Sequence, residues 1–399
     1  QQGFDTYDLT ALCDLHPEAA QYVASVAEQG LGRRPRVYTD YDEMLAKEPG
    51  LDAVNVVTDT RAHHVFALKA FEAGKHVAVE KPMGVTVRAC RRMIDGARRA
   101  NKVLSISENY RRDPVNRLIR ALLETRAVGD PRLILHTALG GGRTVQQVAA
   151  WRHAKLRGGY VLEYGVHDAD LFLFFMGDVE RVYAETHLWE RKRYTGVAPL
   201  VGHLRQFYGH RVQEAEEKGE AIECTAEDMA LAHIRFRSGA AGQLSMSIAM
   251  PGEPTHASML YCSEGSLKLP GSRSGRPVVV TRSGAQGSLP EGEALALAPR
   301  FQLDEVTARF FGGQRRFSTY EMPFEQVDRK LVAIELQDFA SAILDGTELE
   351  VPGEAGLKAV ALCYAILESG HASKAVSFAD VVDDRVNAYQ AEINESVGL

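Results

Sequence analysis

The chain has 399 residues, of which 45% are hydrophobic and 25% are charged, and its formal net charge at pH 7 is −7. These proportions are typical of a globular protein, and the length allows two domains with separate cores. The negative charge disfavours nucleic acid, and no apolar run approaches the roughly 18 residues of a membrane span, so we expect neither partner.

Strands and helices alternate in the first third of the chain. In chain order we predict strands at 7–13, 53–58, 76–80 and 103–107 and helices at 17–29, 63–73 and from 87 onward, the last capped by Thr86. This alternation predicts a doubly wound parallel sheet. Ligands of such sheets bind beyond the carboxyl ends of the strands, where Asp14, Thr58, Glu80 and Lys81 fall.

The pattern changes near residue 128, where strands begin to follow one another with few helices between them. We predict strands at 132–139, 181–189, 228–237, 240–249 and 256–262, helices at 200–218, 328–344 and 354–369, and a surface loop or hairpin at 270–293. This order favours an α+β domain with a large, mostly antiparallel sheet. We therefore place a dinucleotide-binding domain at 1–127 and a second domain at 128–399.

Two short strings carry the chemistry. In the first, Glu80 and Lys81 follow a buried strand directly and precede Pro82, so two opposite charges stand at a water-poor sheet edge. There they either pair with each other or serve a ligand, and the charge pattern favours the two equally. A cis bond between Lys81 and Pro82 is an expectation of the same string.

The second string, 158–171, predicts a helix with Glu163, His167 and Asp170 along one face. A carboxylate one turn before a histidine can fix the tautomer of its ring. The alternatives are a hydrogen-bonded histidine on a packing helix, or a metal pair. A third metal ligand is not evident, so we expect no metal.

With these residues in place, the chain resembles the glucose–fructose oxidoreductase/inositol dehydrogenase (Gfo/Idh/MocA) family. The matching landmarks keep the family's order and spacing over almost the whole chain. They are Asp-Ala-Val at 52–54, Thr58, His63, Ala-Gly-Lys-His-Val at 73–77, Glu-Lys-Pro-Met at 80–83, Trp-Arg at 151–152, Gly-Gly at 158–159, Gly-Val-His at 165–167, Glu-Gly-Ser at 264–266 and Glu-Ser-Gly at 368–370.

The resemblance implies an α/β protein with a Rossmann domain and a second domain whose open sheet forms dimers or tetramers. It implies an NAD-dependent oxidoreductase that moves a hydride between nicotinamide and a sugar, polyol or glycoside carbon. The implied catalytic residues are Lys81, His167 and Glu163. The implied cofactor residues are Asp14, Thr58, His63, Glu80, Lys81, Asn109, Trp151 and Arg152, and the implied substrate residues are Lys81, Tyr110, Arg152, Glu163 and His167.

Three departures from the family pattern affect these expectations. One is Asp59, where Thr-Pro is common, together with an unusually polar segment at 108–114, in which Glu108, Asn109, Tyr110 and Arg111 either touch cofactor or substrate or form a solvated connection. The other two concern the glycine-rich turn and Glu163. The glycine-rich turn of a Rossmann fold is not in the sequence, and Asp14 stands where the ribose-binding acid should follow it by about 20 residues. We therefore expect the natural protein to begin before Gln1. A carboxylate at Asp14 favours NAD over NADP. Glu163 stands where the family more usually has an aspartate, and its extra methylene places the carboxylate farther from the backbone.

Two other functions remain open. An NAD-dependent glycosidase that works by transient oxidation, elimination, water addition and re-reduction fits the polar residues His203, Arg205, His210 and 108–112. A non-catalytic regulator or scaffold is a more remote reading. Because the five cysteines form no C-x-x-C pair, we expect reduced thiols in a cytoplasmic protein.

Overall fold

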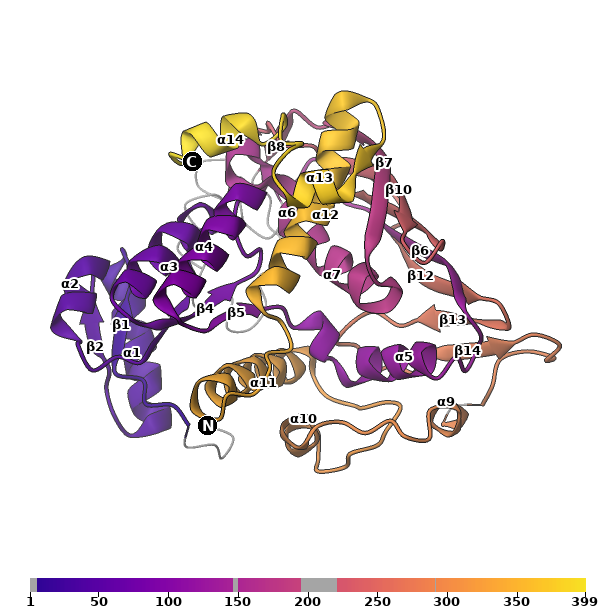
Figure 1. Cartoon of the computed structure of the whole chain (residues 1–399), viewed down its shortest axis with the longest axis horizontal. Coiled ribbons are helices and arrows are strands. Elements are labelled where there is room, and N and C mark those ends of the chain that lie inside the picture. The colour runs from indigo at the N-terminus through magenta and orange to yellow at the C-terminus, as the bar shows by residue number, and fades with distance from the viewer. Residues whose placement is uncertain (1–5, 146–149, 195–220, 291) are drawn as a thin grey trace.

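The computed structural model describes residues 6–145, 150–194, 221–290 and 292–399. Figure 1 shows two layers of unequal size, with the N-terminal strands and helices on one side and a large sheet on the other. The helices α6, α7 and α12 lie between them. Among the described residues, no helix is long and apolar enough to cross a membrane.

The N-terminal part alternates short strands with helices, as predicted. Its elements are β1 (Ala11–Cys13), α1 (Pro17–Leu31), β2 (Arg36–Tyr38), α2 (Tyr41–Lys47), β3 (Ala53–Val56), α3 (His63–Glu72), β4 (His76–Glu80), α4 (Val87–Ala100) and β5 (Leu104–Ser107). The hydroxyl of Thr86 accepts from the backbone N–H of Ala89 and caps α4. After α3 the chain turns at Gly74, where φ is 72° and glycine avoids a steric penalty.

The N-terminal strands are parallel, as predicted, and form two groups. β3, β4 and β5 pair in parallel in that order, while β1 and β2 form a separate parallel pair. Within the described residues no ladder joins the two groups. Asp14 directly follows β1, Thr58 stands two residues after β3 and Glu80 is the last residue of β4, so all three lie at the carboxyl ends of parallel strands.

The second part begins with α5 (Pro114–Glu124) and contains an eight-stranded sheet. Its larger elements are β6 (Pro131–Leu139), α6 (Gly159–Glu163), α7 (Gly165–Met176), β7 (Val179–His187), β10 (Met229–Phe236), β11 (Ala241–Ser247), β12 (Thr255–Cys262), β13 (Gly265–Leu269), β14 (Val279–Arg282), α11 (Phe324–Leu344), α12 (Gly353–Ala372) and β15 (Val376–Ser377). The smaller ones are β8 (Lys192–Tyr194), β9 (Ala221–Glu223), α9 (Glu293–Leu297), α10 (Glu305–Phe310), α13 (Phe378–Val382) and α14 (Ala391–Ser396). The predicted helix at 200–218, with His203, Arg205 and His210, lies outside the described residues.

The strand order of the large sheet is β14-β13-β12-β6-β11-β10-β7-β15. Its pairs are antiparallel except for β11 and β6, so the sheet is mixed but mostly antiparallel, as predicted. For 270–293 we predict a surface loop or a hairpin, and the structure shows a hairpin, in which β14 pairs with β13. Alternate residues of β7 and β10 are buried and exposed, so one face packs on helices and the other is open.

The last long helix corrects one predicted boundary. α12 does not stop at Gly370 but continues to Ala372, and the chain leaves it at Ser373, where φ is 50°. A side chain at Gly370 would come within 2.3 Å of the Thr186 hydroxyl on β7. The glycine therefore allows close packing of helix on sheet and does not end the helix.

The C-terminal helices also contact the first domain. The Tyr364 hydroxyl on α12 donates to the carbonyl of Val85, and the Thr6 hydroxyl donates to Gln337 on α11 at 2.7 Å. The division at residues 127 and 128 remains our proposal, with the two halves joined by a substantial shared core.

Candidate active site

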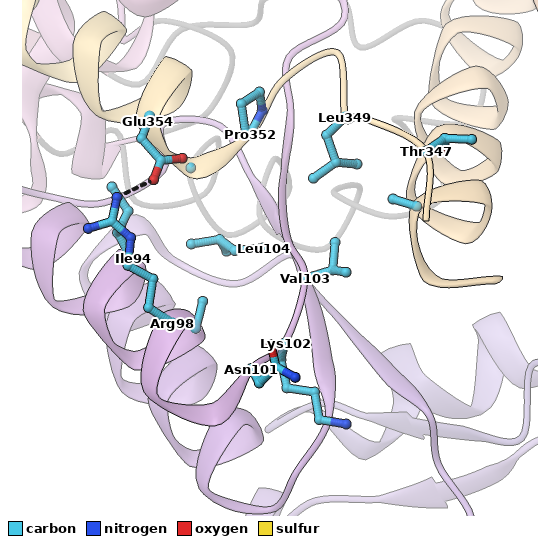
Figure 2. Close-up of a pocket in the computed structure, with 13 residues that line it drawn as sticks. Ile94, Arg98, Asn101, Lys102, Val103, Leu104, Thr347, Leu349, Pro352 and Glu354 are labelled. Atoms are coloured by element: carbon cyan, nitrogen blue, oxygen red, sulfur yellow. Dashed lines mark hydrogen bonds and ion pairs between the residues drawn. The ribbon is translucent and has the colours of Figure 1, made fainter. Parts of the chain in front are cut away.

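One cavity of about 440 Å³ lies away from the predicted chemistry. Figure 2 shows it between the end of α4, the start of β5 and the connection from α11 to α12, with the Arg98–Glu354 ion pair at its rim. Val103 and Leu104 line it from the amino end of β5. Ligands of parallel sheets bind at the opposite, carboxyl ends. The predicted site residues lie at that other edge.

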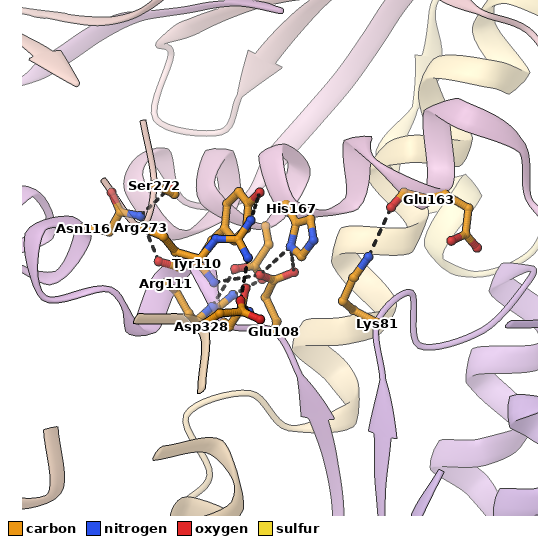
Figure 3. Close-up of polar contacts among 12 residues, drawn as sticks. Lys81, Glu108, Tyr110, Arg111, Asn116, Glu163, His167, Ser272, Arg273 and Asp328 are labelled. Atoms are coloured by element: carbon orange, nitrogen blue, oxygen red, sulfur yellow. Dashed lines mark hydrogen bonds and ion pairs between the residues drawn. The ribbon is translucent and has the colours of Figure 1, made fainter. Parts of the chain in front are cut away.

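Lys81 stands at that edge, directly after β4. The Lys81–Pro82 peptide bond is cis, as expected from the sequence. The ammonium Nζ donates to the backbone carbonyl of Glu163 at 3.4 Å, across the seam between the two domains. Glu80 is therefore not the sole partner of Lys81, and the Lys81 ammonium faces the second domain (Figure 3).

The segment predicted as one helix is two helices, α6 and α7, separated at Tyr164. At the start of α7, a Cβ on Gly165 would lie 3.2 Å from the Met246 sulfur, so the glycine allows a close approach of the helix to the sheet. Glu163, His167 and Asp170 nevertheless all contact the first domain. Each does so through a different partner.

The partner of His167 is Glu108, which follows β5. Ring nitrogen Nδ1 of His167 lies 2.8 and 2.9 Å from the two carboxylate oxygens of Glu108, which is 3% exposed. This corrects the expectation that Glu163 holds the ring. Figure 3 shows the Glu163 carboxylate turned away from His167. Its oxygens meet the Thr60 hydroxyl at 2.7 Å and Arg152 Nε at 3.8 Å.

A stacked tyrosine fixes the plane of the imidazole. The rings of Tyr110 and His167 are 4.0 Å apart between centroids and 7° from parallel. Arg273 donates to the Tyr110 hydroxyl at 2.9 Å and to Asp328 at 2.7 Å. Asn109 donates to the same Asp328 oxygen at 3.3 Å. Figure 3 shows this group on one side of the imidazole and Lys81 on the other.

Burial and charge set the protonation of this pair. Burial lowers the pKa of His167, and Lys81 lowers it further, although Glu108 opposes both. Burial alone would raise the pKa of Glu108, but the contact with His167 brings it below its ordinary value. The arrangement near neutral pH is a neutral imidazole beside an ionised carboxylate.

Arg152 and Trp151 lie next to this centre in a short 3-10 helix, Ala150–His153. The Arg152 guanidinium lies 5.0 Å from the ring centroid of Tyr164 and 5.7 Å from that of Trp151, and donates to the Tyr164 hydroxyl at 3.1 Å. These contacts hold a cation beside Glu163. The place of both residues is compatible with the predicted cofactor and substrate roles, which stay predictions.

His63 is placed differently from its predicted position lining the cleft. Its side chain is buried, with 1% exposure, and its two ring nitrogens lie 3.0 Å from the carbonyls of Thr58 and Pro82. Burial lowers the pKa of the ring. His63 therefore ties the end of β3 to the turn that carries Lys81 and supports the cleft from beneath.

The residues at the strand ends fit a dinucleotide chemically. Asp14 is exposed, and its carboxylate accepts only from the backbone N–H of His16 at 2.8 Å among the contacts of the described chain. Thr58 is also exposed, with only a long 3.4 Å contact from its hydroxyl to the next carbonyl. Carboxylate and hydroxyl oxygens free at a sheet edge are suited to ribose hydroxyls.

Three residues at this centre differ from the sequence-based expectations. Glu108 belongs to the polar segment for which we predict either a ligand contact or a solvated connection, and its pairing with His167 is not among these predictions. Arg273 and Asp328 were not predicted at all, because neither belongs to a recognisable motif. A buried glutamate at a strand end was the only available signal, and it pointed to Glu80 equally well.

Two family models match the chain. Residues 1–108 match the oxidoreductase family with an NAD-binding Rossmann fold, and residues 116–268 match the Gfo/Idh/MocA C-terminal domain. Together these matches span about two thirds of the sequence.

Several named proteins are similar over part of the chain. A 1,5-anhydro-D-fructose reductase of Ensifer adhaerens is 31% identical over 40% of this chain and 47% of its own length. A levoglucosan dehydrogenase of Pseudarthrobacter phenanthrenivorans is 26% identical over 56% of each. The chain thus spans about half the length of these curated relatives.

Solved structures share the fold over a larger part. A levoglucosan dehydrogenase in complex with NADH and L-sorbose superposes with a TM-score of 0.70 and 21% identity, covering 94% of this chain and 90% of that one. At this identity the likeness concerns the fold alone. It confirms the pairing of a Rossmann-type domain with a large sheet domain.

Proposed function

Because the chain belongs to the Gfo/Idh/MocA oxidoreductase family, we propose that it is an NAD-dependent dehydrogenase acting on a sugar or polyol hydroxyl. The observation that carries this proposal is the convergence of Lys81 and His167, from different domains, at the carboxyl edge of β4 and β5. An ammonium and an imidazole at one sheet edge are the groups that alcohol oxidation needs.

The two side chains perform the proton chemistry. An imidazole that is neutral near pH 7 can accept the hydroxyl proton, with a benefit of about a hundredfold or more. The Lys81 ammonium favours the negative charge that develops on the substrate oxygen. Glu163 lies one residue from the α6–α7 junction, where its carboxylate accepts from the Thr60 hydroxyl and lies near Arg152.

A nicotinamide dinucleotide, when bound, supplies the hydride acceptor. Asp14 is the residue we assign to the adenosine ribose, with Thr58 and Glu80 further along the same edge and Asn109, Trp151 and Arg152 towards the nicotinamide. A carboxylate at position 14 repels a 2′-phosphate, which supports NAD over NADP.

The substrate class is supported by the relatives. Levoglucosan, 1,5-anhydro-D-fructose and inositol occur in the names of similar proteins, and all are polyhydroxylated rings. Tyr110, Arg152 and Lys81 are the substrate contacts we propose beside His167. Their mixture of aromatic and cationic groups suits a small ring with many hydroxyls.

The test is a substrate screen. NAD binding is followed by fluorescence, and free sugars, polyols, levoglucosan and aryl glycosides are offered in turn. Stoichiometric NADH from a sugar or polyol supports the proposal. Release of the aglycone without net NADH identifies the glycosidase instead, and the absence of NAD binding favours the non-catalytic alternative.

We also propose a homo-oligomer formed through the open face of the eight-stranded sheet. Tyr183, Leu231 and Tyr261 on β7, β10 and β12 are 41%, 39% and 43% exposed there. A face with apolar side chains on three strands is suited to a second copy. Four of the five free cysteines are buried, which supports our placement of the protein in the reducing cytoplasm.

A further inference from the structure

The two ring nitrogens of His167 have different surroundings. Nδ1 faces the Glu108 carboxylate at 2.8 and 2.9 Å, whereas Nε2 has no hydrogen-bond partner within residues 6–145, 150–194, 221–290 and 292–399. We propose that Glu108 is a positioning residue that fixes the tautomer of His167 and so makes Nε2 the base of the reaction. This inference rests on the proposed function, since it assigns the proton acceptor in that reaction.

The argument begins with the chemistry of the carboxylate. An ionised carboxylate can only accept hydrogen bonds, so the neutral ring of His167 carries its proton on Nδ1. Nε2 then presents a lone pair. In alcohol oxidation the substrate O–H bond breaks and its proton moves to Nε2, while the C–H bond breaks and its electron pair leaves with hydrogen as hydride to nicotinamide. The carbonyl forms, and Glu108 stabilises the resulting imidazolium.

The surrounding contacts hold Glu108 and the ring in this relationship. The backbone N–H of Tyr110 donates to Glu108 Oε1 at 2.9 Å, while the ring of the same tyrosine covers one face of the imidazole. Arg273 in turn fixes the tyrosine hydroxyl. A short segment after β5 therefore supplies both the acceptor for Nδ1 and the stacking surface.

This assignment makes His167, and not Lys81, the base. The charged groups that face His167 are Glu108 from the segment after β5, Lys81 from the turn after β4 and Arg273 from the loop after β13. Glu108 is the only anion among them, and the two cations disfavour an imidazolium. Removal of the carboxylate leaves the cations unopposed, so the ring becomes a weaker base.

The test compares Glu108→Gln with the parent protein in two measurements. In ¹⁵N-histidine-labelled protein, with the His167 signals assigned through His167→Gln, we expect Nδ1 protonated and Nε2 bare in the parent. Glu108→Gln should mix the two tautomers. With levoglucosan or myo-inositol as probe, the acidic limb of the rate–pH profile should move down by about one pH unit or more. The maximal rate should fall about tenfold or more.

A matched control makes the same Glu-to-Gln change at an ion pair away from the ring. Glu354→Gln should leave the His167 tautomer and the acidic limb in place, because Glu354 pairs with Arg98 at the rim of the separate cavity. Glu108→Asp, which keeps the charge, should hold the limb closer to its parent position than Glu108→Gln does. A merely structural role would lower the rate in Glu108→Gln without moving the limb.

The outcomes separate this inference from the proposed function. A protonated Nε2 in the parent protein overturns the inference even if every variant at position 108 fails to fold. An unchanged tautomer and limb in folded Glu108→Gln also overturn it. If no probe is oxidised, the proposed function fails, and the labelled spectra still decide whether Glu108 sets the tautomer.

Discussion

The Lys81 ammonium donates to the backbone carbonyl of Glu163 at 3.4 Å, and this contact joins the first domain to the second at the reacting edge. It places the ammonium by a main-chain atom rather than by a carboxylate. The cationic side chain is therefore held in position while its charge remains available to a substrate oxygen.

Loss of either reacting group should abolish most of the turnover. Lys81→Ala and His167→Ala are each expected to lower kcat by about a hundredfold or more, because each removes a group that acts on the alcohol in the transition state. NAD affinity, measured by fluorescence titration, should persist. A variant that keeps the parent kcat removes its residue from the mechanism.

Glu80 should make stability depend on pH. Burial, opposed in part by Lys81, raises its pKa from 4.5 to about 7. Between these values the folded protein keeps a proton that the unfolded chain releases, so the free energy of unfolding decreases as pH rises. Relative to Glu80→Gln, the parent should therefore lose up to about 3 kcal/mol between pH 4.5 and 7.

Denaturant unfolding at pH 4.5, 6 and 8 measures this difference. The control is Glu72→Gln, because Glu72 is exposed at the end of α3. Its pH dependence should follow that of the parent. A parent and a Glu80→Gln variant whose stabilities run parallel over this range would contradict the prediction.

Two glycine substitutions should act in opposite directions. An alanine at Gly356 of α12 would place its Cβ 2.7 Å from Ile106 and 3.2 Å from the Met83 sulfur, both buried. Such overpacking should cost about 1–3 kcal/mol. At Gly30 of α1 nothing lies within 4 Å, so Gly30→Ala should stabilise by about 0.5 kcal/mol. Thermal unfolding of both variants decides whether they differ in sign.

The open sheet face should control the oligomeric state. Leu231→Asp places a charge in the middle of this face, on β10, and is expected to convert an oligomer to monomers because the buried charge has no partner. Sedimentation measures the change. Val332→Asp, at another exposed apolar position on α11, serves as the control and should keep the parent mass. A monomeric parent would contradict the proposal.

Local sequence patterns predicted the elements that carry the site. The strand at 76–80 and the cap at Thr86 are as expected, because both depend on neighbouring residues alone. The break at Tyr164 was not predicted, because the spacing of Glu163, His167 and Asp170 is that of one continuous helix.

The pairing of Glu108 with His167 could not be predicted from the sequence either, because it joins two elements that are far apart in the chain. Glu108 and His167 are 59 positions apart, and each has a local environment that permits another partner. Glu163 was the nearer carboxylate along the helix, so periodicity selected it. Only the arrangement of β5 against α7 decides between the two.

The segment after β5 contacts α7 through two side-chain pairs. Glu108 pairs with His167, and Arg111 pairs with Asp170, which is 1% exposed. Separating this segment from α7 would leave two buried carboxylates without partners, at a cost of several kcal/mol. These two pairs fix the position of the His167 ring relative to the end of β5. On the proposed function, differences in size among substrates then fall to residues outside the two pairs.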